Sequence, residues 1–344
     1  MLITIFTGRK EMFSMTNFEF KSKFADQLYA FIKMKEDLGQ KSLSYGKLIY
    51  MFDRYLVENN PECDLITQEI VEDWIITMVN NKEITIYMKL SALNQFCRYL
   101  AHIGIPCYIP RLPKYRKSGS DFAPYVFSHE EMDRIFKVAD SLRLKQNNGN
   151  SRLFCVPVVI RLFYSTGLRL NEALGLRNRH INIKDRTITL EITKNNQHRI
   201  VPINDSLKDV LDQYIKEREK LPIVDVNDDD KYFFVSTLGN HIGANTFHHY
   251  FTQILKEAGI KRCKGKIGPR VHDLRHTFAV HSLVEMSKNG VDLYTALPIL
   301  SVFLGHRDIR ITEQYVRFTQ ELFPDIISQS EKLTSDIFPN YKAE

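Results

Sequence analysis

Residues 271–281 read VHDLRHTFAVH. His272, Arg275 and His276 fall within little more than one helical turn, and the i,i+3 spacing puts His272 and Arg275 on one face of a helix. Two histidines and an arginine among apolar residues are unusual for a plain amphipathic helix. A histidine that only packs in the core is the plainest interpretation of His276. The stretch nevertheless predicts a helix whose polar groups do more than pack.

A metal site is the first chemistry to consider for this helix. His272 and His276 lie four residues apart, which is the spacing of a helical zinc pair. No third ligand is evident, and Arg275 between them would oppose a bound cation. The five cysteines of the chain are scattered, without a CxxC motif or a Cys/His cluster. We expect no metal, no cofactor and no disulfide framework, and a bacterial cytoplasmic, nucleoid-associated protein.

Two more stretches carry groups that packing does not require. STGLRLNEALGL (165–176) places Arg169 at the start of a helix, with Glu172 one turn later to hold its guanidinium. LGHRDIRITEQYV (304–316) places His306 nine residues before Tyr315. Taken alone, the first is an exposed ion pair of little energetic value, and the second is a helix with a half-exposed tyrosine.

The middle of the second half has the pattern of a β-hairpin. RTITLEITK (186–194) alternates apolar and polar residues, NNQ turns the chain, and HRIVPI (198–203) returns. Lys194 is expected at the tip, where a lysine is usually just solvated. YFFVS (232–236) is a candidate third strand. The remainder reads as helical, so the fold class is mainly α with a small β-sheet, that is, an α+β catalytic domain behind a helical bundle.

The first hundred residues predict that bundle. Apolar residues recur at helical spacing in four runs between residues 18 and 104, with Gly39 ending the first and Thr67 as a plausible N-cap of the third. The runs at 42–59 and about 85–102 complete the four. Residues 1–17 are expected to be a disordered leader, with Met12 or Met15 as alternative starts. Their apolar residues precede their charges, the reverse of a signal peptide.

A proline-rich basic segment, residues 105–125, separates this bundle from a second domain at 126–344. That domain opens with Ser128 and Glu131, a capping-box pattern. The chain has 344 residues, 44% hydrophobic and 26% charged, with a net charge of +6. No apolar run approaches the ~20 residues that span a bilayer. The clustered cations are candidates for binding a polyanion. They are Arg111, Lys114, Arg116, Lys117, Lys261, Arg262, Lys264, Lys266 and Arg270.

Together these stretches resemble the tyrosine recombinase, or phage integrase, family. That family carries an arginine, a lysine on a β-hairpin, a His-x-x-Arg helix, a His or Trp, and a tyrosine nucleophile, in that order. The matching positions here are Arg169, Lys194, His272, Arg275, His306 and Tyr315. Glu172 matches the acidic residue that supports the first arginine, and His276 is a further supporting residue. The resemblance covers about residues 126–320, and the first domain is less specifically similar to the family's SAM-like core-DNA-binding domain.

The resemblance implies a chemistry that suits these groups. Two guanidinium groups can fork onto phosphate oxygens without a metal, and a phenol of pKa about 10 needs activation before it attacks phosphorus. It further implies His272 as the base, His306 as a hydrogen bond to the scissile phosphate, and Lys194 as the acid that protonates the leaving 5′-hydroxyl. A 3′-phosphotyrosyl intermediate would keep the bond energy, so no ATP is required.

The expected function is therefore site-specific recombination of double-stranded DNA, with integration or excision of a mobile element as the first interpretation. The two domains would form a C-shaped clamp on DNA, and a homotetramer would act on two synapsed sites. Further expectations are a monomer without DNA and accessory directionality factors. The segment after Tyr315 packs either on its own domain or on a neighbouring protomer. Chromosome-dimer resolution, DNA relaxation by a type IB topoisomerase and a DNA-binding protein without activity remain the alternatives.

Overall fold

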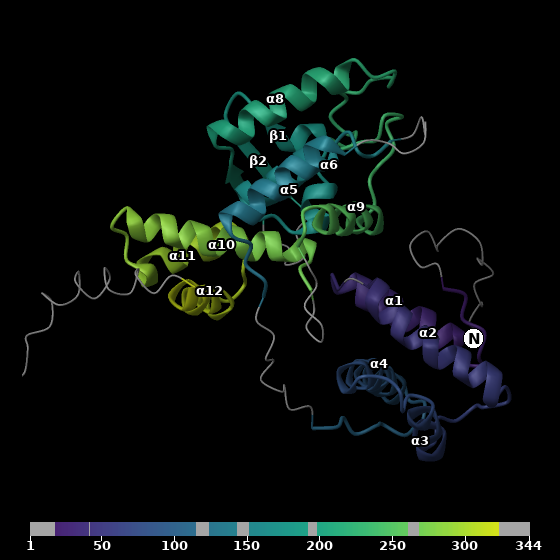
Figure 1. Ribbon diagram of the computed structural model, residues 1–344. Coiled ribbons are helices and arrows are strands. Elements are labelled where there is room, and N and C mark those ends of the chain that lie inside the picture. Colours follow the sequence, from purple (N-terminus) through teal and green to yellow (C-terminus); the bar gives the residue numbers. More distant parts are fainter. Residues whose placement is uncertain are drawn as a thin grey trace, which may run out of the picture. The chain divides into compact units, whose positions relative to one another are not determined.

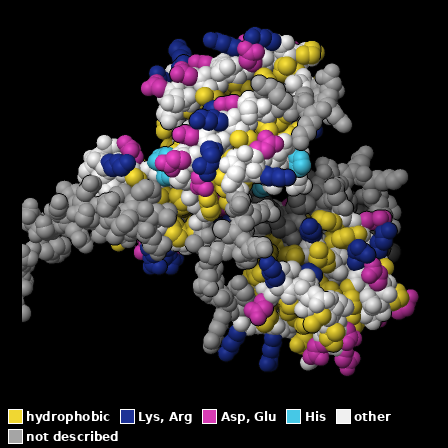
Figure 2. Space-filling model, viewed as in Figure 1, with side chains coloured by type: hydrophobic (Ala, Val, Ile, Leu, Met, Phe, Trp, Pro, Cys, Tyr) yellow, Lys and Arg dark blue, Asp and Glu magenta, His cyan; other side chains and the backbone are white. Residues whose placement is uncertain are grey.

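The computed structural model describes residues 18–40, 42–114, 124–142, 151–191, 198–260 and 268–322. The chain divides into two compact units, residues 1–121 and 122–344, each with its own buried core (Figure 1). The expected leader, residues 1–17, lies outside the described residues. Both charged and hydrophobic side chains reach the surface on the face shown in Figure 2. None of the helices in the described ranges is long and apolar enough to cross a membrane.

The first unit consists of helices, as its periodicity predicts. They are α1 (Ala25–Asp37), α2 (Ser42–Asn59), α3 (Gln68–Ile76) and α4 (Glu83–His102). Thr67 caps α3, since its side chain accepts a hydrogen bond from the Ile70 amide, which confirms the predicted N-cap. Gly39 follows α1 with a φ of 71°, a conformation that glycine adopts without strain. Aromatic and aliphatic side chains from the four helices, including Phe52 and Trp74, fill one core.

The second unit is mostly helical around a small sheet, which confirms the predicted fold class. Its helices are α5 (His129–Ser141), α6 (Val156–Thr166), α7 (Leu170–Leu174), the 3₁₀ turn η1 (Asn178–His180), α8 (Asp205–Glu219), α9 (Ala244–Glu257), α10 (Val271–Lys288), α11 (Leu293–Leu304) and α12 (Ile309–Leu322). The predicted capping box at the start of α5 is present: Ser128 accepts from the Glu131 amide, and Glu131 accepts from the Ser128 amide.

The sheet has the antiparallel order β1 (Ile181–Asn182), β2 (Thr187–Leu190) and β3 (Arg199–Pro202). β2 and β3 are the two arms of the predicted hairpin. The hairpin tip with Lys194 lies outside the described residues. The third strand predicted at 232–236 is wrong: Tyr232 and Val235 each make only a single β-bridge, and Phe233 and Phe234 enter the core from an irregular segment.

Helix α10 is the element on which the site is built. It packs against α6, α11 and α12, and its residues divide between the main core of the unit and a second cluster formed with α11 and α12. Val271 and Leu274 belong to the first cluster, Ala279 and Leu283 to the second. Within the 271–281 stretch, Arg275 donates hydrogen bonds to the ends of both α6 and α11.

Candidate active site

The first catalytic candidate, Arg169, is presented by a break between two helices. α6 ends at Gly167, whose φ of 59° turns the chain, and Arg169 is the N-cap residue of α7. Glu172 accepts from the Arg169 amide at 3.1 Å and from its Nη1 at 2.8 Å. Burial would raise the pKa of Glu172, but hydrogen bonds from Arg199 and Arg169 hold that pKa below its usual value. The Glu172 carboxylate therefore stays charged and fixes the Arg169 guanidinium.

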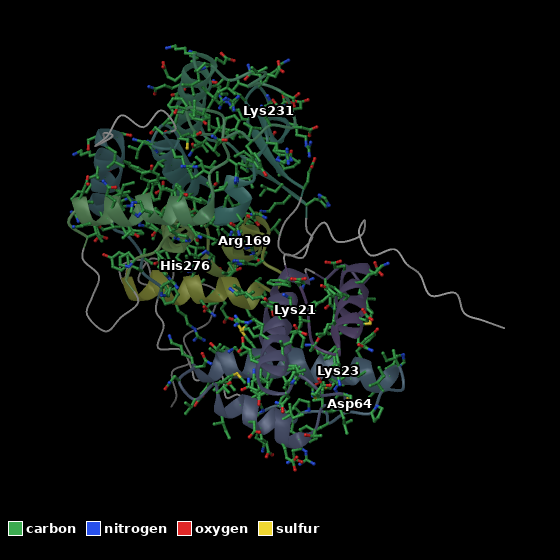
Figure 3. The ribbon with its side chains drawn as sticks, turned by 90° about the vertical axis from the view of Figure 1, so that its right-hand side faces the viewer. Lys21, Lys23, Asp64, Arg169, Lys231 and His276 are labelled. Carbon is green, nitrogen blue, oxygen red and sulfur yellow. The ribbon has the colours of Figure 1, made fainter. Side chains whose placement is uncertain are left out.

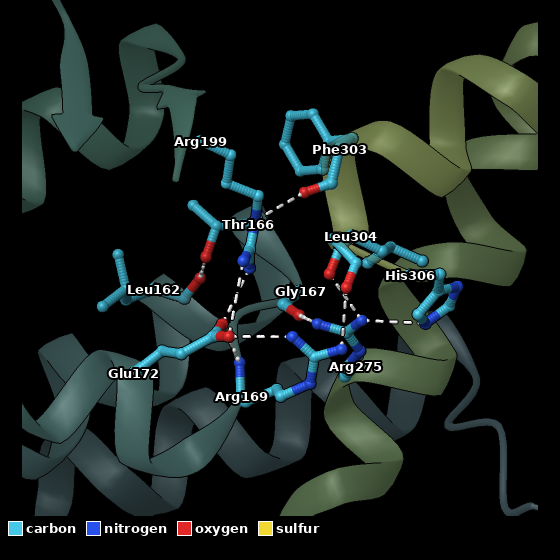
Figure 4. Close-up of polar contacts among 11 residues, drawn as sticks. Leu162, Thr166, Gly167, Arg169, Glu172, Arg199, Arg275, Phe303, Leu304 and His306 are labelled. Atoms are coloured by element: carbon cyan, nitrogen blue, oxygen red, sulfur yellow. Dashed lines mark hydrogen bonds and ion pairs between the residues drawn. The ribbon is translucent and has the colours of Figure 1, made fainter. Parts of the chain in front are cut away.

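The second arginine, Arg275, is almost fully enclosed, with 2% of its surface exposed. Its Nη1 donates to the Gly167 carbonyl at 2.7 Å, and its Nη2 donates to the Leu304 carbonyl at 2.8 Å. Burial, followed by the nearby charge of Arg169, lowers the pKa of Arg275 to about 10, so it remains a cation at neutral pH. Arg169 donates to the adjacent carbonyl, that of Gly305, at 2.9 Å. The two guanidinium groups thus converge on neighbouring carbonyls (Figure 4).

His306 follows those two carbonyls in the chain. Its Nε2 lies 2.9 Å from Arg275 Nη2, and its Nδ1 lies 2.8 Å from Thr312 Oγ1. An arginine can only donate, so Nε2 accepts in this state and Nδ1 carries the proton toward Thr312. Burial and then the charge of Arg275 lower the pKa of His306 to about 3. The imidazole is therefore neutral at neutral pH.

Tyr315, on α12, turns into the site, and only 4% of its surface is exposed. Its hydroxyl lies 2.9 Å from Nδ1 of His276 on α10. Burial raises the pKa of Tyr315 although the charge of Arg275 opposes this, so the phenol is protonated at neutral pH. Burial, followed by the charge of His272, lowers the pKa of His276 to about 3. A neutral imidazole is thus placed to accept the phenolic proton.

His272 takes a different position from the one expected of a base. It is exposed, one turn before His276, and the two ring centroids are 4.8 Å apart. In this state the imidazole that contacts the Tyr315 hydroxyl is His276. The expectation that His272 accepts the tyrosine proton stays a prediction, and His276 is a second candidate for that role because of its contact with Tyr315. Arg169 and His276 are both marked in Figure 3, on the second unit.

Sequence reasoning missed Arg199, which lies in the same network. Its Nη2 donates to Glu172 Oε2 at 2.7 Å, its Nη1 lies 3.3 Å from Oε1, and its Nε donates to the Phe303 carbonyl at 3.0 Å. Thr312, the partner of His306, was missed as well. The signal for Arg199 was the hairpin register: it pairs with Leu190, so both project to the buried face of the sheet.

The candidate DNA-contacting cations are only partly described. Lys261, Arg262, Lys264 and Lys266 lie outside the described residues, as do Arg116 and Lys117. Arg111 and Lys114 are exposed at the end of the first unit. Arg270 caps α10, where its amide donates to Asp273 at 2.7 Å, and its guanidinium pairs with the same carboxylate. Within the described ranges, no group of three His, Cys, Asp or Glu side chains is placed to hold a metal ion.

This geometry can bind a tetrahedral anion and deliver a nucleophile to it. Two cations lie beside a neutral histidine, and a tyrosine is paired with a proton acceptor. The phage integrase family model matches residues 126–321. The chain belongs to the phage integrase family. Members of this tyrosine recombinase family cut and rejoin DNA strands, so the chain is a DNA strand-exchange enzyme that acts in site-specific recombination.

Similar proteins agree with this membership along most of the chain. The "Putative integrase/recombinase y4rB" of Sinorhizobium fredii is 26% identical, over 92% of this chain and 99% of that protein. The tyrosine recombinase XerD of Oceanobacillus iheyensis is 24% identical, over 88% of this chain and 95% of that protein. The XerH recombinase bound to palindromic difH, a post-cleavage complex, has the same fold, with a TM-score of 0.60 and 19% identity over 88% of this chain and 84% of that one.

Proposed function

We propose that this tyrosine recombinase cuts DNA with Tyr315 and holds the scissile phosphate with Arg169 and Arg275. The observation that carries the proposal is the convergence of the two guanidinium groups on the Leu304–Gly305 carbonyls beside His306. Backbone carbonyls bind guanidinium donors less strongly than an anion does, because a hydrogen bond between two charged groups is stronger. An arriving phosphate oxygen therefore competes well for these donors.

The cleavage step moves two protons and exchanges one phosphorus–oxygen bond for another. The Tyr315 oxygen attacks phosphorus, its proton passes to His276 Nδ1, and the bond from phosphorus to the 5′ oxygen breaks. Arg169 and Arg275 neutralise the charge that develops on the phosphoryl oxygens, where preorganised donors have the largest effect. We assign the exposed His272 and His306 to the phosphate. His306 then donates from Nε2, after its proton has moved there from Nδ1 and a phosphate oxygen has taken its place as the acceptor for Arg275. Lys194, outside the described residues, is the proposed proton donor to the leaving 5′-hydroxyl.

Rejoining is the reverse of cleavage and needs no cofactor. A 5′-hydroxyl from a partner strand attacks the 3′-phosphotyrosyl bond and releases Tyr315. Each protomer supplies one tyrosine, and exchange between two duplexes requires four cuts. We therefore propose a homotetramer on two synapsed sites. An apolar hollow of about 960 Å³ between β3 and α11, lined by Ile200, Ile299 and Val302, gives the catalytic unit a surface that a second protomer can cover.

The covalent intermediate is the direct test. A nicked DNA substrate, from which the short cleaved end diffuses away, should trap the protein on DNA, and Tyr315→Phe should trap none. Arg169→Ala and Arg275→Ala should each slow trapping by a factor of about 10² or more while DNA affinity falls much less. An undiminished yield with Tyr315→Phe would exclude Tyr315 as nucleophile. Arginine variants that lose only affinity would place both groups outside the chemistry.

The biological setting is proposed from the relatives. We favour integration or excision of a mobile element, because the relative named an integrase/recombinase is similar over nearly its whole length. Resolution of chromosome dimers is the second candidate, supported by the Xer recombinases among the relatives. Sequencing the DNA that the protein captures covalently in cells decides between them. A type IB topoisomerase would relax supercoils without exchanging strands between two labelled duplexes.

The basic segment 105–125 is proposed to contact the DNA backbone. The exposed Arg111 and Lys114 are candidates for phosphate contacts of this segment. Such contacts set the position of the duplex without choosing its sequence, and they weaken as salt is raised. We also propose that accessory directionality factors act together with this protein.

A further inference from the structure

Arg199 lies at a largely buried position, where the charge of an arginine requires partners. It is the first residue of β3, directly opposite Leu190, and 7% of its side chain is exposed. The hydrogen bonds of its side chain reach elements other than its own strand: two go to Glu172 on α7 and one to Phe303 on α11. A buried guanidinium that lost these partners would be strongly destabilising. Arg199 therefore joins the sheet to both helices that frame the site.

The charge of Arg199 also matters to the phosphate site. Glu172 lies between two arginines, with Arg169 Nη1 at 2.8 Å and Arg199 Nη2 at 2.7 Å. The Arg169–Glu172 pair by itself is neutral, so the carboxylate would cancel much of the attraction of Arg169 for a phosphate. With Arg199 the three groups carry one net positive charge. Glu172 can therefore hold the Arg169 guanidinium by hydrogen bonds, while the positive charge of Arg199 compensates the negative charge of Glu172.

Arg199 also fills the space beneath the turn that leads to His306. A Cβ built on Gly305 would lie 2.7 Å from Arg199 Nη1 and 3.0 Å from its Cζ. The same glycine presents its carbonyl to Arg169 Nη2 at 2.9 Å. The guanidinium of Arg199 and the backbone at Gly305 are therefore in direct van der Waals contact. Through this contact Arg199 supports the turn whose carbonyls accept hydrogen bonds from Arg169 and Arg275.

We propose that Arg199 is a positioning residue for cleavage, which acts on the scissile phosphate through Glu172, Arg169 and the Leu304–His306 turn. This inference rests on the proposed function. We place Arg199 outside direct contact with the phosphate, because each of its three nitrogens already donates to Glu172 or Phe303. Its effect should consequently appear in the charge-stabilising step and should depend on Arg169.

The test is single-turnover cleavage of the nicked DNA by Arg199→Met, Arg199→Lys and wild-type protein. Two substrates are compared, one with the natural phosphate and one with a neutral methylphosphonate at the scissile position. On the natural phosphate, Arg199→Met should be slower by a factor of ten or more, with DNA affinity within a factor of three. Arg199→Lys should recover part of the rate because it restores the charge. On the methylphosphonate, the factor between wild type and Arg199→Met should shrink severalfold.

Two controls separate positioning from folding. Arg161→Met removes another two-bond arginine–carboxylate pair of the same unit, the more exposed contact with Asp140, and should leave cleavage unchanged. The double variant Arg169→Ala/Arg199→Met should be no slower than Arg169→Ala alone, since both changes remove one function. Wild-type rates for Arg199→Met, or an equal loss on both substrates that adds fully to Arg169→Ala, would overturn the inference. A wild-type protein that forms no covalent complex would overturn the proposed function along with it.

Discussion

At the scale of single residues, the site depends on imidazoles that are kept neutral. His276 and His306 both have a pKa of about 3, caused first by burial and then by neighbouring positive charge. A protonated imidazole at either position would place a further cation beside Arg275. Neutrality leaves His276 Nδ1 able to accept a proton from Tyr315, which a cation could not do.

His276 and His272 can be separated by matched substitutions. His276→Asn retains a polar group near Nδ1 but removes the base, so phosphotyrosine formation at pH 7 should slow by about 10²–10⁴. Its residual rate should rise with pH, as the phenol ionises without help. His272→Asn should slow cleavage without that added pH dependence. The reverse pattern in pre-steady-state cleavage rates from pH 6 to pH 10 would return the base to His272.

The residues of the site differ in how far sequence could predict them. The resemblance to the family implies Arg169, Glu172, Arg275 and Tyr315, and the structure brings them together. It implies His272 as the base, but helical spacing alone does not say whether His272 or His276 faces α12. Arg199 required the exact register of the hairpin and its packing on α7 and α11, and Thr312 required the packing of the His306 turn on α12.

At the scale of elements, the end of α6 is the part of the site where Gly167 is packed most tightly against neighbouring helices. The Gly167 carbonyl accepts from Arg275 Nη1, and its φ of 59° is unfavourable for any residue with a side chain. A Cβ at Gly167 would lie 2.5 Å from Phe278 Cδ1 and 2.9 Å from Leu304 Cδ2. The chain at the end of α6 is thus closely packed on both α10 and α11. A side chain at position 167 would have to displace residues of both helices.

Gly167→Ala should therefore lower the free energy of unfolding of the second unit by about 2–4 kcal/mol, from backbone strain plus overpacking. Gly259→Ala is the matched control. Gly259 also has a positive φ, 72°, but no atom of the described residues lies within 4 Å of its added Cβ, so only the strain of about 1 kcal/mol should appear. Denaturant unfolding of both variants measures the difference, and equal losses would show that the packing around Gly167 adapts.

Local sequence patterns predicted the elements whose stabilising contacts join residues close together in the sequence. The cap at Thr67, the capping box at Ser128 and the hairpin of β2 and β3 each involve neighbours in sequence, and all are confirmed. The strand predicted at 232–236 was wrong for the opposite reason. Its aromatic residues have high β propensity, but in the described part of the chain the segment makes only isolated bridges, and Tyr214 holds it through the Phe233 carbonyl and the Val235 amide.

At the scale of the whole molecule, buried neutral histidines make stability depend on pH. Besides His276 and His306, His281 has its pKa lowered to about 4 by burial and then by His129. Each folded-state pKa lies below the ordinary value of about 6.5, so the unfolded chain binds more protons between those limits. Their contribution is complete above pH 6.5 and is lost as the pH falls to about 4 for His281 and to about 3 for His276 and His306.

His281→Asn isolates part of this dependence away from the site. His281 Nδ1 lies 3.0 Å from the Tyr164 hydroxyl, a contact that an asparagine can replace without titrating. The midpoint of thermal unfolding of this variant should fall less between pH 6.5 and pH 4 than that of the wild type. Scanning calorimetry at half-unit steps measures both curves. Parallel curves would mean that His281 binds protons equally in the folded and unfolded states, so that folding does not lower its pKa.

The contact between Arg199 and Gly305 has a consequence for how related proteins can diverge. A side chain at position 305 and a guanidinium at position 199 would occupy the same volume, since the nearest approach is 2.7 Å. Relatives that acquire a larger residue at one position must therefore change the other, and they must find a different counter-charge for the acidic partner of the first arginine. The two positions, 106 residues apart in the chain, should vary together in an alignment.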